Sequence, residues 1–122
     1  LATVGKDGRP RMHPFVPKII DGRLIAFIVN LSYKYHDLMN RRWFAIHAVP
    51  GEQDEEFYIA GRAERIDSES AFRQRAYESM GFVHEMDDIE VMFEFTLDRA
   101  LHTTWLDFGT KDHRPQFRKW RL

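Results

Sequence analysis

The stretch IEVMFEFTL, residues 89–97, alternates apolar and polar side chains along almost its whole length. Every second residue from Ile89 to Leu97 is apolar, and Met92 is the one apolar residue at the intervening positions. Successive side chains of a β-strand point to opposite faces, so this pattern predicts a half-buried strand. We expect a further strand at about Ala100–Leu106.

Two other stretches are apolar on both faces, namely RLIAFIV at residues 23–29 and WFAIHAV at residues 43–49. A strand with one face in water should alternate, so both faces of these strands are expected to be covered. In a chain of 122 residues, we expect another subunit to supply the second cover.

The chain opens with a predicted hairpin. Leu1–Gly5 and Arg11–Phe15 are expected to be strands, and Lys6-Asp7-Gly8 is a turn signal because glycine tolerates positive φ. The second strand has prolines within or beside it, each of which removes a ladder donor, so it is predicted to be an edge or interrupted strand with free backbone groups. These prolines are Pro10, Pro14 and Pro17.

Two helices are expected between the strands. A short helix at about residues 32–40 begins at Ser32 as its N-cap, and the main helix at about 68–80 has Asp67 as its expected N-cap and Gly81 beyond its end. A strand at Phe57–Ala63 contains a glycine bulge or close-approach point, and the tail from Phe108 is expected to be irregular and surface-lying. These elements predict a mainly β fold, a small antiparallel barrel of about six or seven strands in one domain over residues 1–122, whose closure would remove exposed edges.

Composition restricts the classes of function. The sequence has no cysteine, which leaves a cytoplasmic location as the default, and neither a leader nor an apolar run of about 18 residues indicates a membrane protein. Residues 1–50 carry eight Lys or Arg against three Asp or Glu, while residues 51–100 carry five against fourteen. The basic half suits an anionic ligand, the imbalance between halves could help two copies dock, and nucleic-acid binding is disfavoured.

One cluster of residue types suits a phosphate. Ser32 and Lys34 stand at a predicted helix start, Asn30 precedes them, and Arg11 lies on a neighbouring strand. A helix start offers free N–H groups and a favourable dipole, to which a lysine and an arginine add full charges. The alternative is an ordinary cap followed by a solvated lysine. His36, His84, His102 and His113 have no metal-like spacing, so no metal is expected.

In order and spacing, residues 1–66 resemble the pyridoxamine 5′-phosphate oxidase-like family of FMN-binding split barrels. The matching stretches are LATVGKDGRPRMHPF, the following strand with its Ser-x-Lys turn ending in Asp37-Leu38, and EEFYIAGRAERI; the ending HTTWLDFGTKDHRPQFRKWRL looks like that of the smaller oxidase-related members. The resemblance implies a split barrel that binds FMN at the interface of a homodimer. It assigns the flavin ring to Arg11, Met12, His13 and Pro14, the ribityl phosphate to Val29, Asn30, Ser32 and Lys34, and a place near the partner's flavin to Glu56. Trp105 and Trp120 would each cover a ring, or Trp105 would serve packing or dimer contact.

The chain departs from the vitamin B6 oxidases themselves. Val16 stands where those enzymes carry a lysine, and their longer C-terminal substrate-phosphate region is not visible. The leading hypothesis is therefore an FMN-dependent oxidoreductase acting on an unknown small molecule. The alternatives are a split barrel that binds the deazaflavin F420 or haem, a non-catalytic flavin-binding or stress-related dimeric module, and a dimeric scaffold without a cofactor.

Overall fold

The computed structural model describes residues 1–82 and 84–122. Within these residues the chain forms one sheet of eight strands with two α-helices and a short 3-10 helix. The strands are β1 Ala2–Val4, β2 Pro10–Met12, β3 Lys18–Ile20, β4 Arg23–Val29, β5 Trp43–His47, β6 Glu56–Arg65, β7 Glu90–Leu106 and β8 Arg114–Arg121. The helices are α1 Tyr33–Arg41 and α2 Ser70–Ser79, and the 3-10 helix η1 spans Glu52–Asp54.

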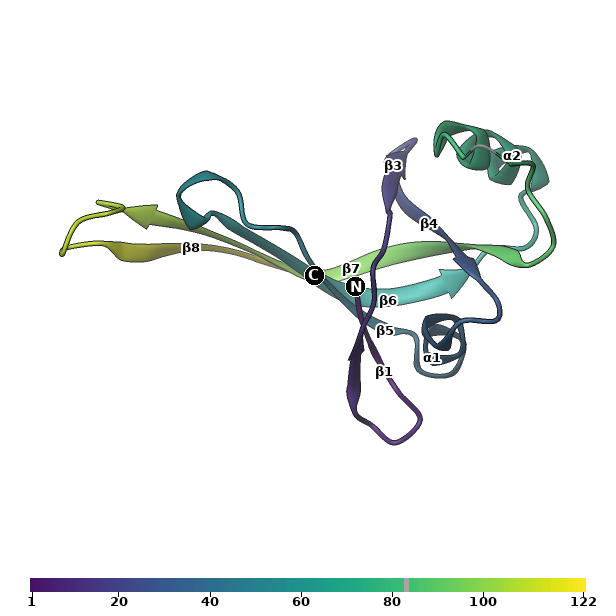
Figure 1. Ribbon diagram of the computed structural model, residues 1–122, viewed down its shortest axis with the longest axis horizontal. Helices are drawn as coiled ribbons and strands as arrows, with labels where there is room; N and C mark the ends of the chain where they lie inside the picture. The colour runs from purple at the N-terminus through teal and green to yellow at the C-terminus, as the bar shows by residue number, and fades with distance from the viewer. Residues whose placement is uncertain (83) are drawn as a thin grey trace.

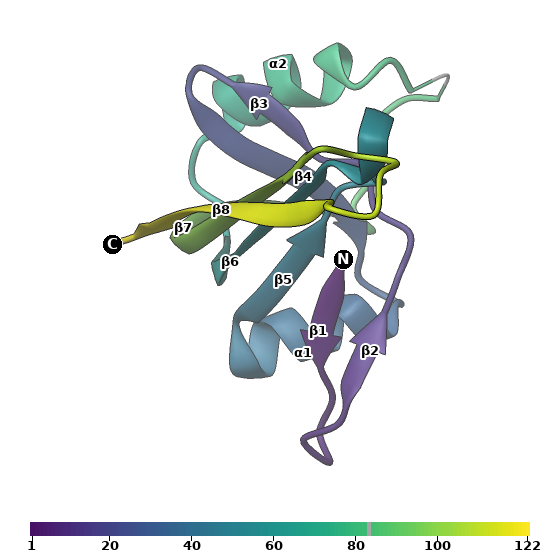
Figure 2. The same cartoon turned by 90° about the vertical axis from the view of Figure 1, so that its left-hand side faces the viewer.

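The strands run in the order β2-β1-β5-β6-β7-β4-β3, and β8 pairs with β7 off this path. Every pairing is antiparallel. The end strands β2 and β3 do not pair with each other in the part of the chain described, so the sheet is a split barrel and not a closed one. The prediction of a mainly β split barrel with helices is confirmed. The expected closure is wrong, because proline-flanked β2 and the short β3 remain edges (Figures 1 and 2).

The core lies on both faces of the first half of β7. Phe93, with an exposed fraction of 0%, packs inside the barrel with Ile28 and Phe44. On the opposite face Met92 packs against Phe72 and Ala76, the latter two from α2. The prediction of a half-buried strand is therefore wrong for this stretch, because α2 covers the face that would otherwise meet water.

Gly61 marks a close approach between β6 and β7. The pairing register shifts between Ala60 and Gly61, and a Cβ atom added to Gly61 would lie 1.9 Å from the carbonyl oxygen of Thr96. Only a residue without a side chain fits there. Opposite this bulge the sequence predicts a gap between a strand ending at Leu97 and one beginning at about Ala100. The structure instead has one continuous strand, β7, which passes through Asp98.

The C-terminal tail is a strand, so the prediction of an irregular tail is wrong. β8 pairs with β7 from Arg99↔Arg121 to Leu106↔Arg114, and all of its residues are exposed. We call residues 99–106 of β7 together with β8 the arm, and the remaining helices and strands the body. Figure 1 shows the arm extending away from the body.

Smaller differences concern element ends. The hairpin turn before Gly8 and the Ser32 cap of α1 are confirmed, since Gly8 has a φ of 82° and the Ser32 hydroxyl accepts a hydrogen bond from the Tyr35 N–H. Asp67 is not the N-cap of α2; it binds Arg65 at 2.6 Å, and Glu69 stands at the cap position. No helix in the part of the chain described is long and apolar enough to cross a membrane.

Candidate functional site

The first turn of α1 lies beside β2 and the chain that follows it. The Lys34 ammonium donates a hydrogen bond to the Pro14 carbonyl at 2.9 Å. The Arg11 guanidinium lies 4.8 Å from the centre of the Tyr33 ring. The fold thus brings together residues 11–14 and 32–34, which the sequence predicts to share a site.

A buried carboxylate joins the two elements. Asp37 has an exposed fraction of 6% and accepts a hydrogen bond from the Thr3 hydroxyl at 2.7 Å. Its Oδ2 also lies 3.7 Å from the Arg11 Nε. The same Thr3 hydroxyl is 2.9 Å from the Nε2 of His13. Arg11 and His13 are therefore held on the α1-facing side of β2 by one buried acid.

Beside this network is a cavity of about 540 Å³ between the β1–β2 hairpin and α1. The side chains of Lys6, Arg11 and Arg41 line it together with a single carboxylate, Asp37. Arg41 already donates to the carbonyl oxygens of Gly5 and Lys6 at 3.0 and 2.7 Å. The excess of cations makes this cavity suited to an anionic group.

Gly5 makes room for the Arg11 side chain. A Cβ atom at this position would lie 2.7 Å from the Arg11 Nε. Any larger residue would push the guanidinium away from Asp37 and out of the cavity wall.

Asn30, at the end of β4, has a buried side-chain oxygen without a hydrogen-bond partner in the described residues. The neighbouring Ser32 hydroxyl is already engaged, donating to the Val29 carbonyl at 2.7 Å and accepting from Tyr35. An unpaired buried acceptor is costly, so a ligand with hydroxyl donors would relieve it. Hydroxyl donors and an anionic group are both present in a ribityl phosphate, and the residues here fit such a group.

The outer edge of β2 offers backbone groups to a ligand. His13 N–H bonds to the Leu1 carbonyl and Gly5 N–H to the Arg9 carbonyl, each at 2.8 Å. Antiparallel pairing alternates, so the Met12 N–H and C=O point away from β1 toward the free edge. The Met12 side chain is 88% exposed. The prediction of free backbone in this segment is confirmed at this edge position.

His13 is half-buried next to these groups. Burial lowers its pKa below the ordinary value of 6.5, the Lys34 ammonium lowers it further, and Asp37 only partly opposes them. The imidazole is therefore neutral at pH 7.

The remaining predicted site residues lie elsewhere in the chain. Glu56 is exposed at the start of β6, opposite Thr103. Trp105 donates from its indole N–H to the Asp54 carbonyl at 3.2 Å, and Trp120 on β8 is 49% exposed. One chain does not bring these three residues to the β1–β2 hairpin (Figures 1 and 2).

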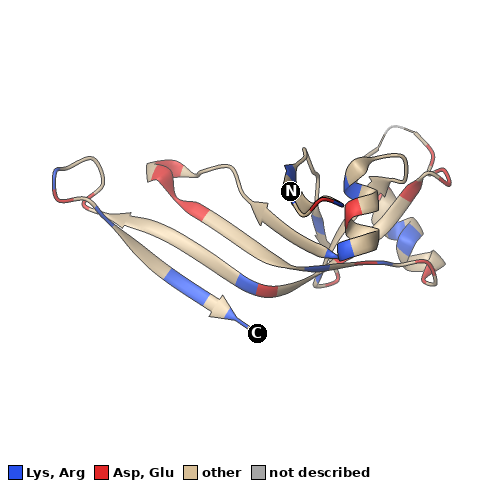
Figure 3. Cartoon of the chain, turned by 90° about the horizontal axis from the view of Figure 1, so that it is seen from below, with Lys and Arg blue, Asp and Glu red and all other residues tan. Residues whose placement is uncertain are grey.

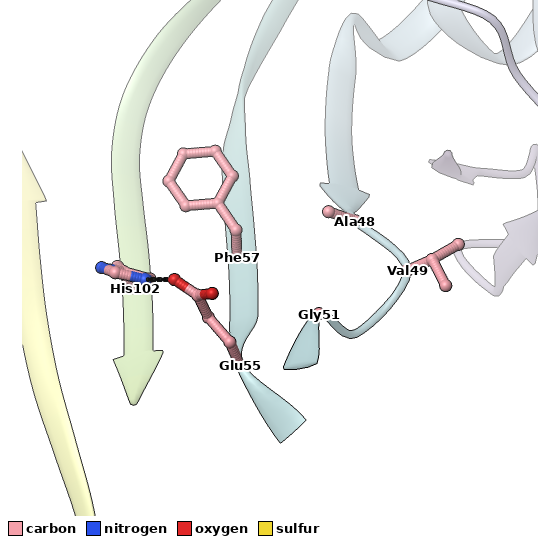
Figure 4. A pocket seen from close by; sticks show the side chains of 6 residues that line it. All are labelled: Ala48, Val49, Gly51, Glu55, Phe57 and His102. Atoms are coloured by element: carbon pink, nitrogen blue, oxygen red, sulfur yellow. Dashed lines mark hydrogen bonds and ion pairs between the residues drawn. The ribbon is translucent and has the colours of Figure 1, made fainter. Parts of the chain in front are cut away.

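A second pocket, of about 380 Å³, lies near the base of the arm. Glu55 and His102 meet in it, with His102 Nε2 2.5 Å from the carboxylate, and Phe57 forms an apolar wall (Figure 4). The sequence pattern predicts no site at Glu55 or His102. No group of three or more residues suited to a metal is found in residues 1–82 and 84–122.

Solved structures with the same fold exist, although no model of a known family matches the sequence and no curated protein matches it. A pyridoxamine 5′-phosphate oxidase-related, FMN-binding protein from Nostoc punctiforme is similar with a TM-score of 0.68 and 14% identity, over 99% of this chain and 84% of that one. General stress protein 26 from Bacillus anthracis has a TM-score of 0.68 and 17% identity, over 99% and 85%. A haem-binding protein from Mycobacterium smegmatis has a TM-score of 0.62 and 16% identity, over 94% and 50%.

At these identities the likeness is one of fold. The chain has the split-barrel fold of the pyridoxamine 5′-phosphate oxidase-related proteins, as its motifs predict.

Proposed function

We propose that the chain binds FMN between the β1–β2 hairpin and the first turn of α1, in a homodimer, and acts as an oxidoreductase on a small molecule. The observation that carries the proposal is that two cations lie at the start of α1, Arg11 beside the Tyr33 ring and Lys34 bonded to the Pro14 carbonyl. The unpaired Asn30 oxygen precedes the same helix. The FMN-binding protein of the same fold supports it.

The phosphate would be held by charge. Arg11 supplies a planar guanidinium whose Nε is near Asp37 while its other N–H groups remain available. Lys34 would exchange its bond to the Pro14 carbonyl for one to a phosphate oxygen. Ser32 caps α1, the amides at the start of the helix would add neutral donors, and Asn30 would accept from the ribityl chain.

The ring would lie along the free edge of β2. Met12 contributes backbone donor and acceptor groups there, and His13 and Pro14 fix the course of the strand. When bound, FMN supplies hydride transfer, and the chain's residues bind it, orient it and limit the access of water.

A second copy would complete the site. Glu56, Trp105 and Trp120 lie on the arm and its base, away from the hairpin of their own chain. Figure 3 shows basic residues, in blue, on β8 and acidic residues, in red, around the start of β6. Opposite charges on two exposed segments favour docking between copies.

The first test is the absorption spectrum of the purified protein, with added FMN. We expect a flavin spectrum and flavin release on denaturation. Arg11→Ala with Lys34→Ala should weaken FMN binding, because charge-assisted contacts worth about 1.5–3 kcal/mol each are lost. The matched control is Arg42→Ala with Lys111→Ala, two exposed cations elsewhere. A colourless protein that ignores added FMN, or a double variant with unchanged affinity, would refute the proposal.

Two alternatives have specific support from proteins of this fold. The haem-binding protein favours a haem site, and general stress protein 26 favours a stress-related module. A deazaflavin F420 site remains an alternative from the family resemblance. A haem or deazaflavin spectrum in place of a flavin one would select the matching cofactor. Bound FMN that no nicotinamide cofactor reduces would select the stress-related module.

A further inference from the structure

The His13 ring has a single hydrogen bond within the described residues, and that bond defines which of its ring nitrogens carries hydrogen. Its Nε2 lies 2.9 Å from the Thr3 hydroxyl. Thr3 is 2% exposed, so water does not compete for this hydroxyl. Nδ1 has no partner among residues 1–82 and 84–122.

The direction of the bond follows from Asp37. A carboxylate only accepts hydrogen bonds, so the Thr3 hydroxyl donates its one hydrogen to Asp37, 2.7 Å away. Toward His13 the same oxygen can only accept. Nε2 must therefore carry the hydrogen, and a neutral ring then leaves Nδ1 as an acceptor.

The surrounding charges keep the ring neutral. Burial and the nearby Lys34 and Arg11 cations lower the pKa of His13, and Asp37 only partly offsets them. Nδ1 therefore stays an acceptor at neutral pH and somewhat below it.

We infer that His13, positioned by Thr3 and Asp37, presents Nδ1 as a fixed hydrogen-bond acceptor to a ring bound along β2, and so selects a ring whose edge carries an N–H donor. The inference rests on the proposed function, in which that ring is the flavin, whose oxidised form has one N–H, at its imide. The Met12 N–H at the neighbouring free edge is a donor. The Met12 N–H would donate to an imide carbonyl, and the His13 Nδ1 would accept from the imide N–H.

The tautomer is tested without any ligand. Nitrogen-15 NMR of the imidazole of His13 should show hydrogen on Nε2 and a bare Nδ1 at pH 7.5. Thr3→Val removes the acceptor and should give a mixture of both tautomers. Hydrogen on Nδ1 in the unchanged protein would overturn the inference.

The acceptor role is tested with FMN and with FMN methylated at the imide nitrogen. His13→Gln keeps a donor near the position of Nε2 but lacks the Nδ1 acceptor, so FMN should bind about threefold to tenfold more weakly. The methylated flavin, which has no N–H to offer, should bind the unchanged protein and this variant equally. His13→Asn keeps an acceptor near Nδ1 and should lose less FMN affinity than His13→Gln.

The control is His47→Gln. The His47 ring has one hydrogen bond among the described residues, to the carbonyl of Ala48, and the variant should bind both flavins as before. Equal weakening of both flavins by His13→Gln would refute the acceptor role. If the unchanged protein binds neither flavin, the proposed function fails, and the NMR measurement still decides the tautomer of His13.

Discussion

The body and the arm of this molecule differ in how far their side chains are buried, although one strand, β7, runs through both. In the body Phe93 and Met92 have exposed fractions of 0%, and both faces of β7 are covered. In the arm every residue of β8 is exposed, including Phe117 at 57% and Trp120 at 49%. β8 pairs with β7 alone among the described residues and buries none of its own side chains, so this edge of the arm is suited to pack on another surface.

The body and the arm also differ in how their charged side chains are paired. In the body Arg23 bridges Glu69 and Glu94 at 2.7 and 2.6 Å, and Asp37 is enclosed by Thr3 and Arg11. The cations of β8 have no ion pair in the described part of the chain. These are Arg114, Arg118, Lys119 and Arg121. The contrast supports the proposed homodimer, in which the arm finds its partners in a second copy.

The largest effect should come from the buried aromatic of the body. Phe93→Ala removes a side chain from the centre of the core and should lower the free energy of unfolding by about 3–5 kcal/mol. Phe117→Ala, the exposed counterpart in the arm, should change it by less than about 0.5 kcal/mol at concentrations where the protein is monomeric. Urea denaturation followed by circular dichroism measures both. Similar losses for the two variants would contradict the division into body and arm.

Dimerisation should depend on the arm and not on the body. Trp120→Ala should weaken dimerisation by about 2 kcal/mol, since exposed tryptophans are frequent anchors of interfaces. Sedimentation over a dilution series measures the dissociation constant. Trp43→Ala is the matched control, because Trp43 is 46% exposed in the body and lies under Arg62. An unchanged constant for Trp120→Ala, or a monomer at micromolar concentration, would count against the arm as an interface.

The smallest effect concerns Glu90, a glutamate that binds a histidine. Glu90 is buried, with Tyr77 at 2.6 Å and His84 at 3.0 Å. Burial acts to raise the pKa of Glu90, but the hydrogen bonds from Tyr77 and His84 outweigh it and lower the pKa below 4.5. Folding therefore gains stability above about pH 4.5 that is lost as the pH falls through the lower pKa of the folded state.

Glu90→Gln should cost about 1 kcal/mol at pH 7 and should flatten the decline of melting temperature between pH 5 and pH 3. Differential scanning calorimetry across this pH range compares the variant with the unchanged protein. A decline equally steep in Glu90→Gln and the unchanged protein would show that Glu90 carries no pH-dependent stability.

Local patterns predict the body well. The Ser32 cap, the turn at Gly8 and the close approach at Gly61 depend on a few adjacent residues, and each is found in the structure. The side-chain alternation of residues 89–97 correctly indicates a strand. The prediction that one face of this strand is exposed is wrong, because that face is covered by α2, which lies more than ten residues earlier in the chain.

The parts that escape prediction depend on distant partners. β8 has no apolar alternation, since Phe117 and Trp120 fall on opposite faces, and its strand form follows from pairing with the edge of β7. Thr3 and Asp37 are separated by 34 positions, so no local pattern connects them. Arg11, Pro14 and Lys34 could be grouped in advance only through the motif order, and their flavin role stays a prediction.

The register shift beside Gly61 has a consequence for how such a protein can change over generations. In the body the odd-numbered residues Val91 to Leu97 of β7 face the core, whereas beyond Asp98 it is even-numbered Ala100 that packs against it. The alternation of inward-facing and outward-facing side chains along β7 shifts by one residue at Asp98. Lengthening or shortening the arm by a pair of residues therefore leaves the alternation of the core untouched. The arm can thus change in length during evolution, and so extend more or less far toward a partner, while the core keeps the same packing.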